Sequence, residues 1–146
     1  MYKWAILGTG NMANQMGPAI RGNPFSSLSV VASRDISRAN RFAYNHDLKK
    51  VHASYVNAIR DTAVDVVYIA LPPALHYPVI WECIQNRKAV VCEKPICITN
   101  DEFRRVRDEA HRKSIFVMEA NFMKCLPSHR KAQELIQQGK IGAPSH

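Results

Sequence analysis

The sequence predicts an α/β protein built on an open, doubly wound parallel sheet. Apolar runs typical of strands alternate with segments typical of helices from one end of the chain to the other. The strand-like runs are continuously apolar, as in "VDVVYIAL" (64–71), instead of alternating with polar residues. Such runs indicate a sheet covered on both faces, and therefore parallel strands joined by crossover helices. The chain has 146 residues, enough for one domain with its own core.

Six strands and six helices are expected in alternation. The strands are predicted at 3–8, 27–33, 51–55, 64–71, 89–93 and 115–120. The helices are predicted at 11–21, 36–46, 56–60, 75–87, 99–113 and 128–138. Two helix starts carry clear capping signals, Asp35 and the capping box Thr99 to Glu102. Pro18 should kink or shorten the first helix, because proline lacks the N–H of a helical hydrogen bond.

Composition narrows the class of protein. Apolar residues make up 47% of the chain and charged residues 22%, which indicates a globular protein. No apolar run approaches the roughly 20 residues of a membrane span, and the N-terminus lacks the pattern of a secretory signal. The four cysteines are isolated and match no common metal-ligand spacing, so we expect reduced core thiols, no metal and a cytoplasmic location.

The net charge of +8 raises the question of a nucleic-acid partner. The basic residues are spread over the predicted helices, with no block of five or six like charges and no aromatic residues interleaved. A phosphorylated small molecule accounts for a basic site equally well. We therefore expect a small-molecule partner and treat a basic, nucleic-acid-associated protein as the less favoured alternative.

The turn after the first strand has the pattern of a phosphate-binding loop, Gly8-x-Gly10-x-x-Ala13. Gly8 permits a tight turn, Gly10 lets a pyrophosphate approach the backbone, and the small Ala13 lets helix and strand pack closely. The free N–H groups and the positive dipole end of the helix then face the phosphates. The predicted cofactor loop consists of Gly8, Thr9, Gly10, Asn11, Met12 and Ala13.

The end of the second strand bears on the choice between NAD and NADP. NAD-binding sites place an acidic residue at this strand's tip, where this chain has Ser33 and Arg34, with Asp35 displaced into the capping position. Arg34 is suited to a 2′-phosphate, and Arg38 in the first turn of the next helix is favourable only beside an anion. We predict NADP as the cofactor, with NAD as the alternative.

Polar residues follow three further strands at the edge where doubly wound sheets bind ligands. Glu93 and Lys94 end the fifth strand, and Pro95 stops it, so that both charges are presented at its tip. The other candidates at this edge are Leu71, Pro72 and His76 after the fourth strand, and Asn121 and Lys124 after the sixth.

These motifs together resemble the N-terminal half of the Gfo/Idh/MocA oxidoreductases. The resemblance rests on "GTGNMA", "VASRD", "DVVYIALPPALHYPVI", "CEKPI" and "EANFMKCLPSHRKAQELIQQGKIG", and it covers essentially the whole chain. It implies a Rossmann domain in which Lys94 lies beside the nicotinamide and the substrate hydroxyl, while Glu93 helps to hold that end of the cofactor. Ser33 and Arg34 resemble the pair that binds the 2′-phosphate. Lys124 stands where an arginine is common and cannot make the bidentate contact of arginine.

The resemblance also implies a second domain, an open sheet that contributes substrate contacts and a partner for the lysine. Residues 1–146 are predicted to form one NAD(P)-binding domain, and residues 121–146 to lead towards the second domain. We expect the cofactor domain of an NADP-dependent oxidoreductase of sugar-like or cyclic alcohols, truncated, inactive alone and prone to self-association through uncovered apolar surface. The alternative is a non-catalytic NADP(H)-binding module or sensor.

Overall fold

The computed structural model describes residues 1–142, and its six strands form one sheet. All neighbouring strands are parallel, in the order β3-β2-β1-β4-β5-β6. The strands are β1 (Tyr2–Leu7), β2 (Ser26–Ala32), β3 (Lys50–His52), β4 (Val66–Ile69), β5 (Ala89–Cys92) and β6 (Val117–Glu119). The predicted doubly wound parallel sheet is therefore confirmed.

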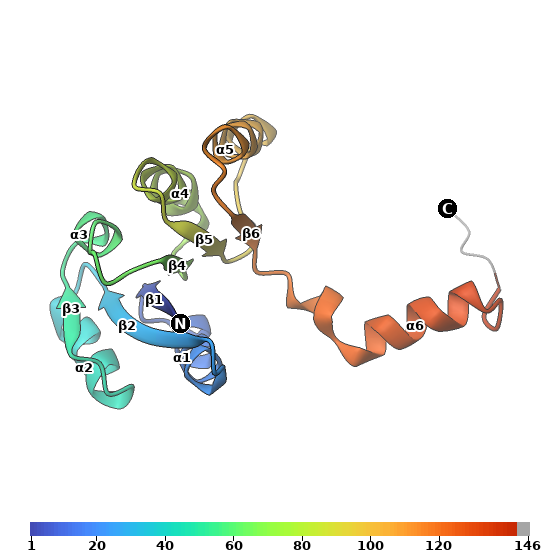
Figure 1. Cartoon of the computed structure of the whole chain (residues 1–146), viewed down its shortest axis with the longest axis horizontal. Helices are drawn as coiled ribbons and strands as arrows, with labels where there is room; N and C mark the ends of the chain where they lie inside the picture. The colour runs from blue at the N-terminus through green and yellow to red at the C-terminus, as the bar shows by residue number, and fades with distance from the viewer. Residues whose placement is uncertain (143–146) are drawn as a thin grey trace.

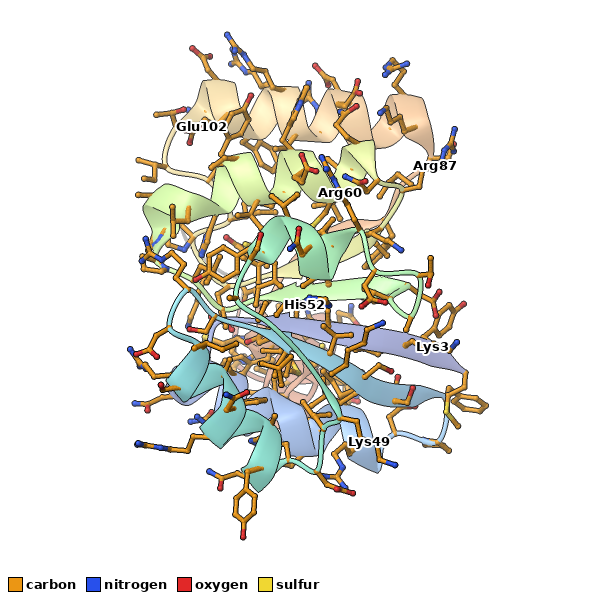
Figure 2. The ribbon with its side chains drawn as sticks, turned by 90° about the vertical axis from the view of Figure 1, so that its left-hand side faces the viewer. Lys3, Lys49, His52, Arg60, Arg87 and Glu102 are labelled. Atoms are coloured by element: carbon orange, nitrogen blue, oxygen red, sulfur yellow. The ribbon has the colours of Figure 1, made fainter. Side chains whose placement is uncertain are left out.

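Helices connect the strands and form a layer on each side of the sheet (Figures 1 and 2). The α-helices are α1 (Asn11–Gly22), α2 (Ile36–Asn45), α3 (Tyr55–Ile59), α4 (His76–Gln85), α5 (Asn100–Lys113) and α6 (Pro127–Gln137). Two short 3₁₀ helices are η1 (Pro73–Leu75) and η2 (Phe122–Cys125). Charged side chains such as Lys49, Arg60 and Arg87 stand on several sides of the molecule in Figure 2, as expected for a spread of charge.

Alternate residues of the buried strands pack against the two helical layers. In β1, Ala5 and Leu7 belong to the core under α3, α4 and α5, whereas Ile6 belongs to the core under α1 and α2. Side chains that alternate along a strand point to opposite faces of the sheet, so an apolar residue at every position is required. This explains the continuous apolar runs of the sequence.

Several local signals behave as predicted. The Asp35 carboxylate accepts hydrogen bonds from the amides of Ser37 and Arg38 at the start of α2. Thr99 and Glu102 form the reciprocal capping box of α5. Pro78 lies in the first turn of α4.

Two expectations on helix and cysteine placement were wrong. Pro18 does not shorten α1, which runs on to Gly22; the residue before the proline, Gly17, has no Cβ to clash with the proline ring. Cys125 is exposed and Cys97 is only half-buried, because both lie outside the strands and helices that form the two cores; Cys83 and Cys92 are buried as expected.

The strands at the two edges of the sheet, β3 and β6, are also shorter than predicted. Only Lys50–His52 and Val117–Glu119 pair with a neighbouring strand, because an edge strand has hydrogen-bond partners on one side only. Beyond β6 the chain turns away from the sheet through η2, and α6 projects from the body with no buried residue (Figure 1). No helix in the described part of the chain is both long and apolar enough to cross a membrane.

Candidate cofactor and active site

The glycine loop is shaped by two glycines with different physical requirements. Gly8 has a φ of +98°, and a Cβ there would lie 2.3 Å from the carbonyl oxygen of Ala70. Gly8 is therefore required by the fold itself. Gly10 has an extended conformation (φ −80°, ψ −172°), and a Cβ there would meet nothing within 4 Å. Neither backbone strain nor packing requires Gly10, and the open space beside it suits a ligand that must approach the backbone.

The N-terminus of α1 is available to an anion. Gly10 caps the helix without a side-chain hydrogen bond, and the first turn contains no acidic residue. The first amides of a helix have no partner within the helix, and the helix dipole adds partial positive charge there. Asn11 is exposed at this turn, while Ala13 is fully buried against the sheet. Phosphate oxygens are suitable partners for these amides.

A cleft of about 300 Å³ joins this loop to the ends of β2 and β4. It is lined by Gly8, Thr9, Gly10, Ser33, Arg34, Asp35, Arg38, Tyr55, Ala70, Leu71 and Pro72. Ser33 is buried, and its hydroxyl accepts a hydrogen bond from the Asp35 amide, whereas Arg34 and Arg38 are exposed. Within residues 1–142 no salt bridge involves either arginine. The structure thus brings eight of the predicted cofactor residues together around one cleft.

Tyr55 belongs to this cleft and was missed by the sequence reasoning. It is the first residue of α3 and also lines a neighbouring hollow beside Arg34. Its only signal in the sequence is an aromatic residue at the end of the third predicted strand, which by itself is weak.

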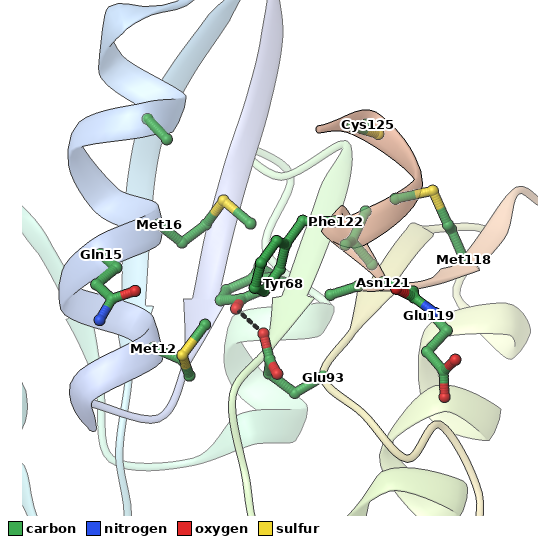
Figure 3. A pocket seen from close by; sticks show the side chains of 13 residues that line it. Met12, Gln15, Met16, Tyr68, Glu93, Met118, Glu119, Asn121, Phe122 and Cys125 are labelled. Atoms are coloured by element: carbon green, nitrogen blue, oxygen red, sulfur yellow. Dashed lines mark hydrogen bonds between the residues drawn. The ribbon is translucent and has the colours of Figure 1, made fainter. Parts of the chain in front are cut away.

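A second, larger hollow of about 680 Å³ lies between α1 and the ends of β5 and β6 (Figure 3). We call it the apolar groove, and it includes three predicted site residues, Met12, Glu93 and Asn121. Its other lining residues are Gln15, Met16, Ala19, Tyr68, Val91, Met118, Glu119, Ala120, Phe122 and Cys125. Sequence reasoning placed Tyr68 in a strand and η2 in a connection, so it missed Tyr68 and Phe122.

Tyr68 and Glu93 form a buried pair on the floor of the apolar groove. The Tyr68 hydroxyl donates to Glu93 Oε1 at 2.5 Å, as Figure 3 shows. Burial of the ring, followed by the hydrogen bond to Glu93, raises the pKa of Tyr68 far above its usual value. The phenol therefore stays protonated at neutral pH and remains a donor to the carboxylate.

Lys94 extends from the same strand end into solvent. No salt bridge joins it to Glu93, so a simple ion pair between these neighbours does not account for the two charges. Lys94 Nζ instead lies 5.3 Å from the centroid of the Phe122 ring. A cation over an aromatic face is weakly stabilised and keeps its three N–H donors for other partners.

Neighbouring elements fix the backbone on both sides of Lys94. The Glu93 amide donates to the Ile69 carbonyl at 2.9 Å, and the Ile96 amide donates to Glu119 Oε1 at 2.9 Å. The Pro95 carbonyl lies 2.7 Å from Nδ1 of His76. His76 itself is fully buried, so the structure places it behind the site edge and not on the cleft surface. A part of His76 in cofactor binding stays a prediction, and the ring lines neither of the two hollows.

Two remaining expectations concern Lys124 and a metal. The side chain of Lys124 lies outside the described part of the structure, although its backbone belongs to η2. Among residues whose placement is described, no group of three or more His, Cys, Asp or Glu side chains could hold a metal ion.

A dinucleotide fits the arrangement of these residues. Its phosphates match the uncapped start of α1 and the open side of Gly10, and an anionic group on its ribose matches Arg34 and Arg38. The apolar groove begins at Met12, next to the glycine loop, and ends beside Glu93 and Phe122. Both hollows lie at the carboxyl ends of the strands, and they are lined by different residues.

Comparison with known proteins at the level of sequence agrees with a dinucleotide-binding site. Residues 2–121 match the family model GFO_IDH_MocA, described as an oxidoreductase family with an NAD-binding Rossmann fold. The chain is 34% identical over 142 residues to mouse trans-1,2-dihydrobenzene-1,2-diol dehydrogenase and 32% identical to the human enzyme. These alignments cover 96% of this chain but 43% and 42% of those enzymes, so the chain spans less than half the length of these relatives.

Solved structures extend the comparison to the fold. KijD10, a 3-ketoreductase from Actinomadura kijaniata crystallised with NADP and TDP-benzene, is 28% identical with a TM-score of 0.89, over 97% of this chain and 43% of that one. The scyllo-inositol dehydrogenase of Lactobacillus casei is 20% identical with a TM-score of 0.89, over 97% and 43% of the two chains, and shares the fold. The sequence match over residues 2–121 and the parallel sheet with its glycine loop lead to one conclusion: this chain belongs to the Gfo/Idh/MocA oxidoreductase family and contains its NAD(P)-binding Rossmann domain.

Proposed function

We propose that this chain binds NADP(H) in preference to NAD(H) and is the cofactor domain of an oxidoreductase acting on a sugar-like or cyclic alcohol. The observation that carries the proposal is the cleft of about 300 Å³, where the uncapped start of α1 and the open side of Gly10 face two arginines. Arg34 and Arg38 have no acidic partner in the described part of the chain. An anion such as a 2′-phosphate would therefore be a suitable partner for both side chains. The diol dehydrogenases named above support the substrate class.

The residues at the chemical end have distinct proposed roles. Bound nicotinamide supplies or accepts the hydride. Lys94 polarises or protonates the substrate oxygen, because its ammonium is free of carboxylate partners and remains available as a donor. Glu93, anchored by Tyr68, provides a fixed acceptor beside the cofactor, and Phe122 forms an apolar wall of the groove.

We further propose that residues 1–146 bind the cofactor without turning over substrate by themselves. Lys94 is exposed, as are Met118, Phe122 and Asn121 along the groove. Efficient hydride transfer needs the reacting carbon held roughly 3–3.5 Å from its partner in a site that excludes water. An open groove meets neither condition until another surface covers it.

The test is a titration of the purified chain with NADPH and with NADH, followed by absorbance assays on a panel of cyclic diols, polyols and aldoses. The expected result is tighter binding of NADPH and no turnover. Equal affinity for both nucleotides would contradict the proposed preference. Turnover that disappears in Lys94→Ala would contradict the proposed inactivity, and turnover that persists in Lys94→Ala would contradict the role of the lysine.

A further inference from the structure

The imidazole of His76 lies between two backbone segments that belong to different parts of the site. The ring is fully buried, with Nδ1 at 2.7 Å from the Pro95 carbonyl oxygen and Nε2 at 2.8 Å from the Leu71 carbonyl oxygen. Leu71 follows β4 and lines the cofactor cleft, while Pro95 directly follows Lys94. We call this arrangement the His76 bridge.

Both neighbours of the ring are hydrogen-bond acceptors only. A neutral imidazole carries one N–H, so it can satisfy one carbonyl and must turn a lone pair towards the other. At least one of the two contacts is therefore a hydrogen bond that the ring donates, and both carbonyls lie within 2.8 Å of the same buried ring. His76 is also the first residue of α4, so the ring joins this helix to both backbone segments.

We propose that His76 is a positioning residue for Lys94, and that it acts by holding the Pro95 and Leu71 carbonyls against one buried ring. The inference rests on the proposed role of Lys94 in the reaction. The Pro95 carbonyl, held by His76, and the Ile96 amide, held by Glu119, fix the chain immediately after Lys94. Because the other end of the bridge is the Leu71 carbonyl, the lysine keeps a constant place relative to the cleft that receives the dinucleotide.

The first measurement concerns the ring alone and needs no cofactor. In the ¹⁵N-labelled wild-type chain, a ring N–H of His76 should give a signal that exchanges slowly with solvent, as expected for a buried hydrogen bond, and the signal is assigned by its loss in His76→Gln. A ring N–H that exchanges as fast as that of a free imidazole would overturn the proposal.

The second measurement follows Lys94. The lysines are reductively ¹³C-methylated, the Lys94 signal is assigned by its absence in Lys94→Arg, and its position is compared in His76→Phe and His76→Gln. His76→Phe removes the hydrogen bonding of the ring and should shift and broaden the signal, whereas His76→Gln retains one donor group and should give an intermediate effect. The exposed histidine of α5, His111, provides the matched control His111→Gln, which should leave the signal unchanged.

Affinity for NADPH separates this proposal from the proposed function. Loss of a buried hydrogen bond corresponds to up to roughly a tenfold change in an equilibrium constant, so we expect a rise in Kd of up to about tenfold for His76→Phe and a smaller rise for His76→Gln. A folded His76→Phe variant with an unchanged Lys94 signal would refute the positioning role. Failure of the wild-type chain to bind NADPH would refute the proposed function instead, while the ring and lysine signals would still decide the His76 bridge.

Discussion

Two groups of charged residues in this molecule are organised in opposite ways. Around Asp61, next to β3, every charge has a partner: Lys50 Nζ and His52 Nε2 lie 2.7 Å and 2.9 Å from Asp61 Oδ2, and the Ala63 amide donates to Oδ1. At the carboxyl ends of the strands, Arg34, Arg38 and Lys94 have no acidic partner in the described residues. The first group stabilises the fold, and the second group remains available to a ligand.

The comparison shows that the number of charges is a poor guide to a site, because their pairing decides what they do. Burial would raise the pKa of Asp61, but the hydrogen bonds from Lys50, Ala63 and His52 lower it well below its usual range. A carboxylate satisfied in this way has no capacity left for a ligand. Arg34, Arg38 and Lys94 differ from Asp61 in this respect. A bound anion would give these cations the acidic partner that the described part of the protein does not provide.

The largest expected effect comes from closing the open side of Gly10. Gly10→Val should raise the Kd for NADPH by at least about a hundredfold, because the new side chain occupies the space through which the pyrophosphate approaches the helix start. The conformation of Gly10 suits valine, so the variant should stay folded. Titration calorimetry together with circular dichroism checks both statements.

Two other glycines are the controls for this prediction. Gly22→Val also points its side chain into open space, and it should leave NADPH affinity unchanged. Gly8→Ala should instead unfold or strongly destabilise the chain, because its Cβ would collide with the Ala70 carbonyl. Normal NADPH affinity in Gly10→Val would show that the loop does not hold the phosphates.

A smaller effect is expected from removing one unpaired cation. Arg34→Ala should reduce a roughly ten- to hundredfold preference for NADPH to near equality, since a charge-assisted contact with phosphate contributes about 1.5–3 kcal/mol. The affinity for NADH should hardly change. Arg105→Ala, at an exposed position on α5, is the matched control, and the two nucleotide affinities are measured by fluorescence titration. The assignment fails if Arg34→Ala weakens NADH and NADPH equally.

The smallest effect is expected on stability, from a change at Asp61 and its partners. Asp61→Asn should lower the free energy of unfolding by about 1 kcal/mol at neutral pH, because Lys50 is half exposed and the amide keeps one acceptor oxygen. The pKa of Asp61 is lower in the folded chain than in the unfolded chain. Its contribution is therefore present above the unfolded value of about 4 and is lost as the pH falls towards the lower folded value.

Urea denaturation between neutral and acidic pH checks this prediction. The difference in unfolding free energy between the wild type and Asp61→Asn should shrink steadily below about pH 4. A difference that does not depend on pH would mean that the Asp61 charge is not what stabilises this region. The affinity of Asp61→Asn for NADPH should equal that of the wild type, because the charges around Asp61 are not expected to contact the cofactor.

The sequence by itself determined the local features of this protein. Continuous apolar runs, the caps at Asp35 and Thr99 and the glycine spacing depend on residues close together in the chain, so the sheet, most helices and the phosphate loop could be predicted. The same reasoning placed Glu93 and Lys94 at a strand end, because parallel strands present their carboxyl ends at one edge. The continuation of α1 through Pro18 was also a local feature, because it depends on the adjacent Gly17, but the sequence reasoning gave more weight to the proline.

Only the tertiary structure decided how the chemical end is held together. Tyr68 and Glu93 are 25 residues apart, and His76 and Pro95 are 19 apart, and neither pair follows a spacing rule. They meet because the strand order places β4 beside β5 and the register pairs Ile69 with Cys92 and Cys92 with Glu119. Such contacts depend on which strand ends lie level with each other, and that is fixed by packing of the whole sheet and not by any local pattern.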